Sequence, residues 1–538
     1  MKQNNIIWTT LFSLLLSWSL SAQKAPLQEM RGAWVATVNN IDWPTTPNRS
    51  PEQQRKEFLQ LLDDLKAMGF NAVFVQIRPA GDAFYPSKLA PWSKFLSGQQ
   101  GLAPSPYYDP LEFMIKAAHE RRMEFHAWLN PYRATTDLDT AALASSHPLR
   151  SLGPERKQQW FFQYGSRYYF NPANPLVVRY IDQIVKEIVS TYDVDGIHFD
   201  DYFYPYPEQG EVLPDQTFFA NNPKGFTSIH DWRRDHINSL IQTVSQTIRS
   251  TKPWVRFGIS PFGVWRNASK DPKGSATNAS FSSYDDLYAD VLLWLQKNWI
   301  DYVAPQLYWS IGFPAADYHA LTDWWSKNTF GKQLYIGHGA HKIGNGSQYK
   351  DANWNKKEQT NRQIAINRQT PGVHGSIFFS IKALRQNTLG VRDSLQRTLF
   401  NTPALVPSPI TYNNITPVTP QFCRVDTQRD SVRFSWSACE VLTPEEMPYY
   451  FGIYRFKGEK TGDFKNPENL LALTPYAFPE ENWKWSDHQL KEGEPYTYAL
   501  VAYNRYHQAS IASEPIFIKK TDKGVRKKRP IWGYRFRG

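Results

Sequence analysis

The segment Gly196-Ile-His-Phe-Asp-Asp-Tyr202 has the alternating pattern of a short β-strand that ends in two carboxylates. Successive side chains of a strand point to opposite faces. Ile197 and Phe199 therefore share one apolar face, and His198 and Asp200 share the other. The pattern predicts a strand that packs one face against helices and turns its polar face toward a different environment.

The same kind of strand recurs along the chain, with amphipathic helical patterns between consecutive strands. This alternation predicts parallel βα units, and eight units over roughly 370 residues predict an α/β fold, a (β/α)8 TIM barrel. A doubly wound open sheet is the alternative, but no glycine-rich phosphate loop follows the first strand, as its dinucleotide-binding version would require. The expected strands cover residues 32–38, 72–79, 124–131, 196–202, 256–262, 302–309, 333–340 and 375–383, and the clearest helices cover residues 51–68, 109–122, 175–192, 231–250, 285–298 and 389–400.

A proline-rich segment separates the barrel from a C-terminal region with a different pattern. Short stretches of alternating apolar and polar residues follow this segment, which is typical of a small all-β sandwich with Trp436 in its core. The run over residues 496–504 resembles the late strands of fibronectin type III domains. We therefore expect a barrel over residues 27–400, a Pro-rich linker over 401–420, a fibronectin type III-like sandwich over 421–520 and a basic tail over 521–538.

Residues 1–22 have the features of a signal peptide. Lys2 gives a positively charged start, residues 6–20 are mostly apolar, and Ser21 and Ala22 are small residues suited to cleavage. The apolar stretch is short and is interrupted by serine and threonine, so we expect no stable membrane insertion. The mature chain is therefore predicted to be exported, to the periplasm or the extracellular space.

The composition favours a carbohydrate ligand. Aromatic residues make up 15% of the chain, with 20 Trp and 29 Tyr, and aromatic faces stack well on the C–H faces of pyranose rings. The net charge of +11 attracts polyanions, but no nucleic-acid-binding motif is present, so we expect no nucleic-acid partner. The sequence identifies no protein partner. It also leaves open whether Cys423 and Cys439 form a disulfide.

Polar side chains are predicted to gather inside the barrel, at the carboxyl ends of the strands. The outward face of each strand should be apolar because it packs on helices, which leaves the polar positions pointing inward. A purely structural barrel fills that space with Val, Ile and Leu, and polar groups buried without partners are costly. We therefore interpret the polar ring as a solvated active site. The residues expected to face inward are Gln76, Arg78, His126, Trp128, Asn130, His198, Asp200, Gln306, Tyr308, His338 and Lys382.

Three carboxylates are candidate catalytic residues. Glycoside hydrolysis generally needs carboxyl groups that flank the bond to be cleaved. Asp200 and Asp201 end the fourth strand, and repulsion between adjacent carboxylates can raise the pKa of one of them toward that of a proton donor. Asp82 follows the second strand and is the third candidate. A loop-capping role for Asp201 and a turn-forming role for Asp82 are the alternatives.

Other hydrolytic chemistries lack their sequence motifs. The chain has no Gly-x-Ser-x-Gly stretch, which disfavours a serine hydrolase, and no His-Glu-x-x-His stretch, which disfavours that class of zinc protease. His126, His198 and His338 could meet at a metal ion inside a barrel, but their spacing is not diagnostic. We therefore predict no metal ion and no other cofactor.

Six stretches of the predicted barrel are distinctive. They are Arg31-Gly-Ala-Trp-Val35, Val75-Gln-Ile-Arg-Pro-Ala-Gly-Asp-Ala-Phe-Tyr-Pro86, His126-Ala-Trp-Leu-Asn-Pro-Tyr-Arg133, Gly196-Ile-His-Phe-Asp-Asp-Tyr-Phe-Tyr-Pro205, Gly258-Ile-Ser-Pro-Phe-Gly263 and Ala304-Pro-Gln-Leu-Tyr-Trp309. Together they resemble the glycosyl hydrolase-like 10 family of exported bacterial barrel proteins. One enterobacterial relative cleaves peptidoglycan glycan strands that have been stripped of their stem peptides. The resemblance therefore implies a glycoside hydrolase, with that glycan as the leading substrate.

Two mechanisms are open for such a site, both by resemblance to other barrel glycosidases. In the first, Asp200 is the nucleophile or base, and Asp82 or Asp201 is the acid. In the second, the N-acetyl group of the substrate attacks the anomeric carbon while Asp200 orients it, Asp201 protonates the leaving oxygen and Tyr308 assists. A glycosidase acting on another polysaccharide and a non-catalytic glycan-binding scaffold are the alternative functions. The residues expected to contact the substrate are Trp34, Gln76, Arg78, His126, Trp128, Asn130, Tyr132, His198, Tyr202, Gln306, Tyr308 and Trp309.

Overall fold

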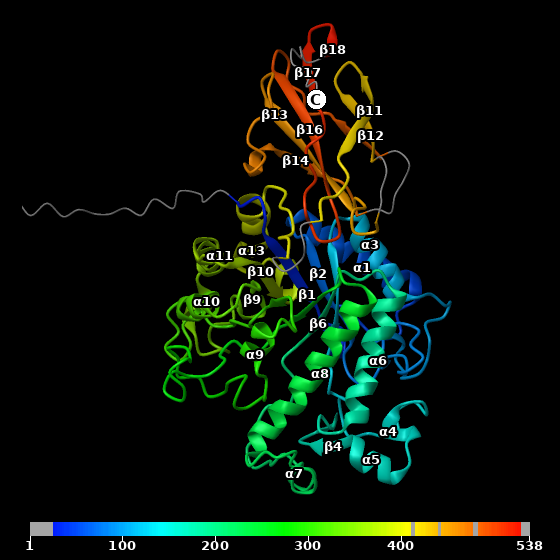
Figure 1. Ribbon diagram of the computed structural model, residues 1–538, viewed down its shortest axis with the longest axis vertical. Helices are drawn as coiled ribbons and strands as arrows, with labels where there is room; N and C mark the ends of the chain where they lie inside the picture. The colour runs from blue at the N-terminus through cyan, green and yellow to red at the C-terminus, as the bar shows by residue number, and fades with distance from the viewer. Residues whose placement is uncertain (1–24, 410–414, 439–442, 477–482, 529–538) are drawn as a thin grey trace, which may run out of the picture.

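The computed structural model describes residues 25–409, 415–438, 443–476 and 483–528, and the expected signal peptide lies outside these ranges. Eight parallel strands close into a barrel in the order β1-β10-β9-β8-β7-β6-β3-β2. Five of them, β1, β2, β6, β9 and β10, are labelled in Figure 1. Each strand predicted from the sequence is present, so the barrel is confirmed and the open sheet is wrong. The barrel strands are β1 (Met30–Val35), β2 (Ala72–Arg78), β3 (Glu124–Leu129), β6 (Gly196–Phe199), β7 (Arg256–Ile259), β8 (Tyr302–Val303), β9 (Gln333–Gly339) and β10 (Val373–Phe379).

Helices surround the barrel and begin where the sequence supplies capping residues. Ser50 accepts a hydrogen bond from the backbone N–H of Gln53, whose side chain in turn accepts one from the backbone N–H of Ser50, and Pro51 occupies the first helical position. Proline is tolerated there because its missing N–H would have no partner in the helix. The longer helices are α1 (Pro51–Ala67), α3 (Pro110–Glu120), α6 (Pro175–Thr191), α8 (Ile229–Thr251), α10 (Tyr318–Lys327) and α11 (Gln359–Gln369).

Two predicted helices differ from the structure. Within residues 285–298 only α9 (Val291–Gln296) is helical. Residues 389–400 hold short α13 (Val391–Ser394) and a π-helical turn rather than one helix. The interruption lies at Leu389 and Gly390, whose φ angles of 53° and 75° belong to the left-handed region, and a right-handed helix cannot pass through it.

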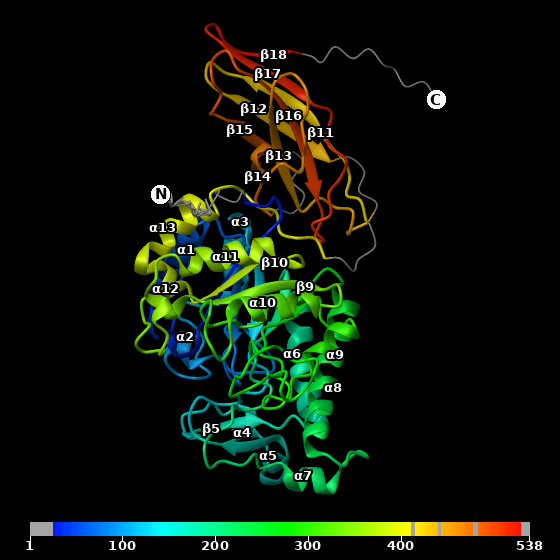
Figure 2. The same ribbon diagram turned by 90° about the vertical axis from the view of Figure 1, so that its left-hand side faces the viewer.

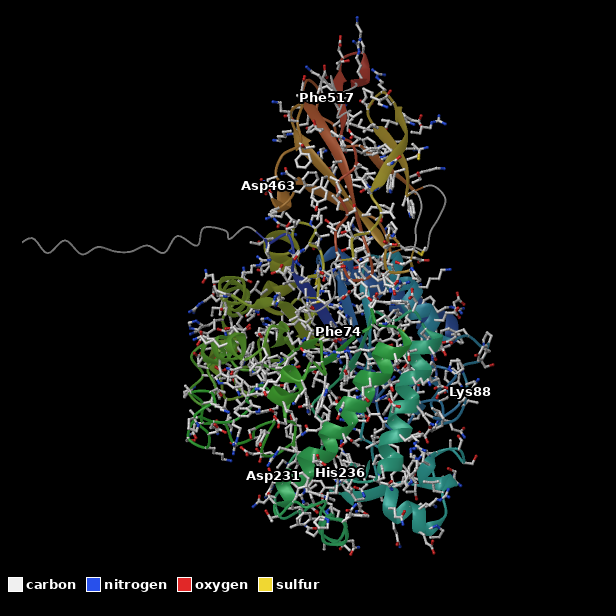
Figure 3. The ribbon with its side chains drawn as sticks, viewed as in Figure 1. Phe74, Lys88, Asp231, His236, Asp463 and Phe517 are labelled. Atoms are coloured by element: carbon white, nitrogen blue, oxygen red, sulfur yellow. The ribbon has the colours of Figure 1, made fainter. Side chains whose placement is uncertain are left out.

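The two faces of the barrel strands separate as the alternation predicts. Outward residues such as Val75 and Phe199 join the large apolar core beneath the helices. Inward residues such as Phe74, Tyr302 and Tyr335 form a separate cluster that fills the barrel, and Phe74 is labelled in Figure 3. A barrel filled in this way is a packed core rather than a pore. A ligand must therefore bind above it, at one end.

The C-terminal region is a two-sheet β-sandwich, and β12, β13 and β16 confirm three predicted strands. Trp436 is fully buried in it, as expected. The sandwich extends beyond the predicted boundary at residue 520, because Gly524–Lys528 pairs with β17 as strand β18. Cys423 is an exposed free thiol, and Cys439 lies outside the described residues. The strands are β11 (Pro420–Thr427), β12 (Val432–Ala438), β13 (Tyr450–Lys457), β14 (Leu470–Leu473), β15 (Trp483–Asp487), β16 (Pro495–Tyr503), β17 (Ile516–Thr521) and β18.

The first part of the predicted linker is packed against the barrel instead of running free. The backbone N–H of Leu405 donates to the carbonyl of Leu27 at 2.8 Å, and the N–H of Glu29 donates to the carbonyl of Leu405 at 2.9 Å. The guanidinium of Arg31 donates to the carbonyl of Thr402 at 2.7 Å. This stretch therefore ties the sandwich to the start of the barrel.

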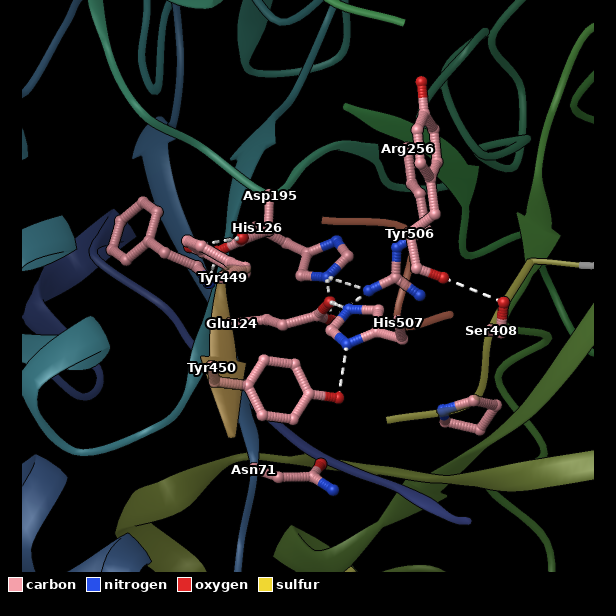
Figure 4. A network of polar contacts seen from close by, with 12 residues as sticks. Asn71, Glu124, His126, Asp195, Arg256, Ser408, Tyr449, Tyr450, Tyr506 and His507 are labelled. Atoms are coloured by element: carbon pink, nitrogen blue, oxygen red, sulfur yellow. Dashed lines mark hydrogen bonds and ion pairs between the residues drawn. The ribbon is translucent and has the colours of Figure 1, made fainter. Parts of the chain in front are cut away.

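The sandwich docks on the amino-terminal ends of the barrel strands through buried polar groups (Figure 4). Nε2 of His507 lies 2.6 Å from Oε1 of Glu124, at the start of β3, and Nδ1 of His507 lies 3.0 Å from the hydroxyl of Tyr450. Glu124 also pairs with Arg256 inside the barrel. The sandwich therefore closes one end of the barrel.

The long loops occupy the opposite end. Two views show the sandwich at one end of the molecule and α4 (Pro148–Ser151), α5 (Pro154–Trp160) and α7 (Gln216–Asn221) at the other (Figures 1 and 2). These segments follow the carboxyl ends of β3 and β6. No helix within the described ranges combines the length and apolar character needed to span a bilayer.

Candidate active site

A cavity of about 300 Å³ opens at the carboxyl ends of the barrel strands. Each of the eight strands, or the loop that follows it, contributes at least one residue to its wall. This convergence is the arrangement predicted for a barrel active site. The lining residues are Trp34, Ala36, Val38, Ile41, Gln76, Trp128, Arg133, Asp200, Asp201, Tyr202, Tyr206, Ser260, Gln306, Tyr308, His341 and Phe379.

Asp200 is buried in the wall of the cavity, with 4% of its surface exposed. Its Oδ2 accepts hydrogen bonds from Nε1 of Trp128 at 3.2 Å and from Nδ2 of Asn130 at 3.1 Å. Its Oδ1 is buried and has no hydrogen-bond partner within the described part of the chain. Burial and the neighbouring charge of Asp201 raise the pKa of Asp200 to about 7. Asp200 can therefore carry a proton near neutral pH.

Asp201 lies beside it and is also buried. The hydroxyl of Tyr206 donates a short hydrogen bond to Oδ2 of Asp201. Burial raises the pKa of Asp201, and hydrogen bonds from Tyr206 and Gln306 oppose that rise because they favour the ionised form. The negative charge of Asp201 is itself one cause of the raised pKa of Asp200. The two carboxyl groups therefore titrate together as a pair, and the pair retains a proton near neutral pH.

Arg133 brings a guanidinium group into the same cavity, with 6% of its surface exposed. Its backbone N–H donates to Oδ1 of Asn130 at 3.0 Å, and its Nη1 donates to the carbonyl of Pro79 at 3.3 Å. The guanidinium carbon lies 4.5 Å from the centre of the Tyr202 ring. The positive charge of Arg133 lowers the pKa of both carboxyl groups.

Aromatic rings lead from the carboxylates toward the surface. The ring centre of Tyr206 lies 5.5 Å from that of Tyr202 and 6.2 Å from that of Phe281, which is 36% exposed. Elsewhere in the wall the rings of Tyr308 and Phe379 lie nearly parallel, with centres 6.2 Å apart. These rings present apolar faces on which a pyranose ring can stack.

Six of the residues predicted to contact substrate line the cavity. Asn130 does not, but it positions Asp200 through the hydrogen bond described above. The ring of Trp309 packs edge-on against Phe262 at 5.4 Å and is not part of the wall. The six lining residues are Trp34, Gln76, Trp128, Tyr202, Gln306 and Tyr308.

The inward prediction for Arg78 is wrong because the register of β2 shifts. Gln76 pairs with Trp128 of β3, but Arg78, two residues later, pairs with Leu129. An extra residue in a strand reverses the alternation beyond it. Arg78 therefore shares the outward face with Leu129, and its guanidinium lies 5.5 Å from the ring centre of Phe170.

Asp82 and Tyr132 also lie away from the cavity wall. Oδ1 of Asp82 accepts a hydrogen bond from the backbone N–H of Ala80 at 3.2 Å, within its own turn, as the turn-forming alternative expects. Tyr132 is 1% exposed and belongs to the apolar core under the helices. The geometry therefore does not support Asp82 as the acid or Tyr132 as a substrate contact.

His126 and His198 face inward as predicted, but both are fully buried beneath the cavity. The ring of His126 stacks on Phe74 in the packed interior, with centres 4.3 Å apart. Nε2 of His198 accepts a hydrogen bond from Nε1 of Trp34 at 3.1 Å. Neither histidine lines the cavity, so the predicted substrate contacts of both are wrong. The two side chains lie below the cavity and support its wall.

The predictions for His338 and Lys382 are wrong. His338 points out of the barrel, where Nδ2 of Asn367 on α11 lies 3.1 Å from its Nε2. Lys382 lies beyond the end of β10, in α12 (Ile381–Arg385). Because His338 and His126 lie on opposite faces of the barrel wall, the three histidines cannot converge on one metal ion.

The sequence interpretation missed eight residues of the wall. Arg133 ends one of the distinctive stretches, Ser260 lies inside another, and Tyr206 comes directly after a third, so proximity to those stretches was the available signal. The other five come from loops or strand ends whose direction was not predicted. The eight residues are Ala36, Val38, Ile41, Arg133, Tyr206, Ser260, His341 and Phe379.

Comparisons with known proteins agree with this architecture. Residues 29–356 match the family model described as glycosyl hydrolase-like 10. The chain is 43% identical over 491 residues to glycosyl hydrolase YngK of Bacillus subtilis, covering 90% of this chain and 93% of that protein. It is 38% identical over 368 residues to glycosyl hydrolase DigH of Escherichia coli K12, covering 65% of this chain and 83% of that protein.

Among solved structures, the glycoside hydrolase domain of PgaB from Bordetella bronchiseptica is similar at 14% identity and a TM-score of 0.43, covering 69% of this chain and 99% of that domain. That likeness is too distant to inform the site. The family match extends over more than half of the chain and contains both Asp200 and Asp201. The chain therefore belongs to the glycosyl hydrolase-like 10 family and is a glycoside hydrolase.

Proposed function

We propose that this protein cleaves glycosidic bonds in a cell-envelope glycan, with peptidoglycan strands stripped of their stem peptides as the principal substrate. The observation that carries the proposal is the pair formed by Asp200 and Asp201 in one cavity, where burial and mutual repulsion raise the pKa of Asp200 to about 7. A carboxyl group with such a pKa can donate a proton at neutral pH, while its neighbour stays ionised.

In the proposed mechanism, Asp200 protonates the leaving glycosidic oxygen. Asp201, held by the Tyr206 hydroxyl, stays ionised and orients the N-acetyl group of the substrate, whose carbonyl oxygen attacks the anomeric carbon. Water then opens the resulting ring and restores the N-acetyl sugar, with the proton returned to Asp200. These roles of the two carboxylates are the reverse of those expected from the sequence.

Nucleophilic attack by the substrate suits the described cavity for a geometric reason. The two carboxylates that line it are neighbours at the end of one strand. A double displacement through an enzyme nucleophile needs carboxyl groups on opposite sides of the scissile bond. Tyr308 and Phe379, which also line the wall, are aromatic residues and cannot serve as an opposed carboxylate. An N-acetyl sugar supplies the missing nucleophile itself.

The experiment compares wild-type protein with Asp200→Asn and Asp201→Asn on purified peptidoglycan, with and without prior amidase treatment. Products are identified by mass spectrometry. We expect reducing ends only from the amidase-treated sample, and a loss of rate of at least ~100-fold in either variant, the scale of general acid–base catalysis. Asp82→Asn is the matched control and should retain activity.

Two outcomes would overturn the proposal. Turnover by purified Asp200→Asn at the wild-type rate would show that Asp200 is not the proton donor. Binding of the glycan by wild-type protein without any cleavage would identify a non-catalytic scaffold. Cleavage of another polysaccharide in place of peptidoglycan would keep the chemistry and change the substrate.

The proposed setting is outside the cytoplasm. The charged start, apolar stretch and small residues within 1–22 support export. Mass spectrometry of the protein recovered from outside the cytoplasm should show that its chain begins after Ala22, and recovery of the uncleaved chain from the cytoplasm alone would contradict export.

A further inference from the structure

We infer that Arg133 binds a carboxylate carried by the sugar in the cavity, so that the enzyme selects an acidic glycan over a neutral one. The inference rests on the proposed glycosidase function and adds to it the charge of the substrate. It assigns to Arg133 a binding role that is separate from proton transfer by Asp200 and Asp201.

The guanidinium of Arg133 is buried with most of its hydrogen-bonding capacity unused. A guanidinium has five N–H donors and no acceptor. Within the described part of the chain, Nη1 donates to the carbonyl of Pro79 at 3.3 Å, and the buried Nε has no partner. Buried donors without acceptors are costly, and the described residues place no carboxylate in an ion pair with this group. The guanidinium therefore has N–H donors left for an acceptor group on a bound ligand.

Arg133 supplies the lasting positive charge of the cavity. His341 is the other basic side chain in the described wall, and burial lowers the pKa of His341 to about 4, which leaves its ring neutral. The face of the Tyr202 ring supports the guanidinium carbon at 4.5 Å and restricts its orientation. A fixed, planar guanidinium matches a carboxylate, because two parallel N–H groups can meet two oxygens.

The chemistry of the proposed substrate provides such a carboxylate. In stripped peptidoglycan strands, every second sugar carries a lactyl ether that ends in a free carboxylate. When the stem peptide is present, the same carbonyl is part of a neutral amide. Arg133 would therefore distinguish the two forms by charge. Uronic acids carry a carboxylate on the ring and are the second source of the same chemistry.

The test combines one substitution in the protein with one chemical change in the substrate, so that four protein–substrate pairs are compared. Wild-type protein and Arg133→Gln are each assayed on stripped strands and on the same strands whose carboxylates have been converted to methylamides. Arg179→Gln, an exposed arginine on α6, is the control for the loss of one positive charge. The measured quantity is the ratio of kcat/KM between acidic and amidated strands.

We expect wild-type protein to favour the acidic strands by about 10- to 100-fold, the scale of a hydrogen bond to a charged group, and Arg133→Gln to show a ratio near one. Arg179→Gln should keep the wild-type ratio. If Arg133 only adjusts the carboxyl pair, Arg133→Gln will slow both substrates equally and leave the ratio unchanged, which would overturn the inference.

Two further measurements separate the role of Arg133 from an effect on catalysis and identify which sugar carries the carboxylate. The Asp200→Asn variant, with and without Arg133→Gln, is tested for binding to both kinds of strand, because a binding role must appear without turnover. Hyaluronan, an alternating polymer of N-acetylglucosamine and glucuronate, is assayed in parallel. Its cleavage, with a rate that depends on Arg133, would assign the carboxylate to a uronic acid. If wild-type protein cleaves none of these glycans, the proposed function fails rather than the role of Arg133.

Discussion

The hydrogen bond from Tyr206 to Asp201 makes a measurable prediction about the pH dependence of the enzyme. Tyr206→Phe removes the hydroxyl that donates to Oδ2 of Asp201 and keeps the ring beside Tyr202 and Phe281. The lost bond favours the ionised carboxylate, so its removal raises the pKa of Asp201. A hydrogen bond to a charged group contributes about 1.5–3 kcal/mol, and about 1.4 kcal/mol corresponds to one pKa unit, so the rise should be about one to two units.

The assay is the pH profile of kcat/KM, whose acidic limb reports the first ionisation of the carboxyl pair in the free enzyme. In Tyr206→Phe this limb should move to higher pH by about one to two units. Tyr204→Phe is the matched control, because the hydroxyl of Tyr204 donates to Asp215 at 3.3 Å, away from the cavity. An acidic limb that stays in place in Tyr206→Phe, or moves to lower pH, would show that the Tyr206 hydroxyl does not stabilise the ionised form of Asp201.

Two further predictions concern the rim of the cavity and the domain interface. Phe281→Ala should raise KM for long glycan strands by about fivefold with little change in kcat, because an exposed stacking surface beside Tyr206 is lost. Phe330→Ala should not, because Phe330 is also exposed but lies just before the start of β9, at the opposite end of the barrel. His507→Leu leaves Oε1 of Glu124 without that partner and should lower the free energy of unfolding by about 1–3 kcal/mol in denaturant titrations. The exposed His488→Leu should be neutral, and equal losses in both histidine variants would contradict the interface argument.

The fold could be predicted because its signals are local and repeat. Residues 196–202 show apolar and polar positions in alternation, and the same pattern returns at the other barrel strands. Alternation also placed Gln76, Trp128 and Asp200 on the inner face, where the structure has them. The period of a strand is two residues, so a few side chains suffice to assign a face.

Local alternation was misleading where the backbone departs from its regular register. The register shift after Gln76 turned Arg78 outward, and the end of β10 at Phe379 left Lys382 in a helix. Neither the register shift nor the end of the strand is indicated by the residues around it. Both depend on how a neighbouring strand or loop packs, and so they could not be predicted from residue types alone.

The barrel, the sandwich and the position of Asp200 at the end of a strand could be predicted from residue types alone, because these follow from patterns within short stretches of the chain. Three features depend on the folded chain: Asp201 meets the Tyr206 hydroxyl, Arg133 enters the cavity with few partners, and His507 of the sandwich reaches Glu124. Arg133 and His507 meet partners that are distant in sequence, and the contact between Asp201 and Tyr206 depends on the path of the loop that joins them. Their geometry depends on how the whole chain packs, which no local pattern contains.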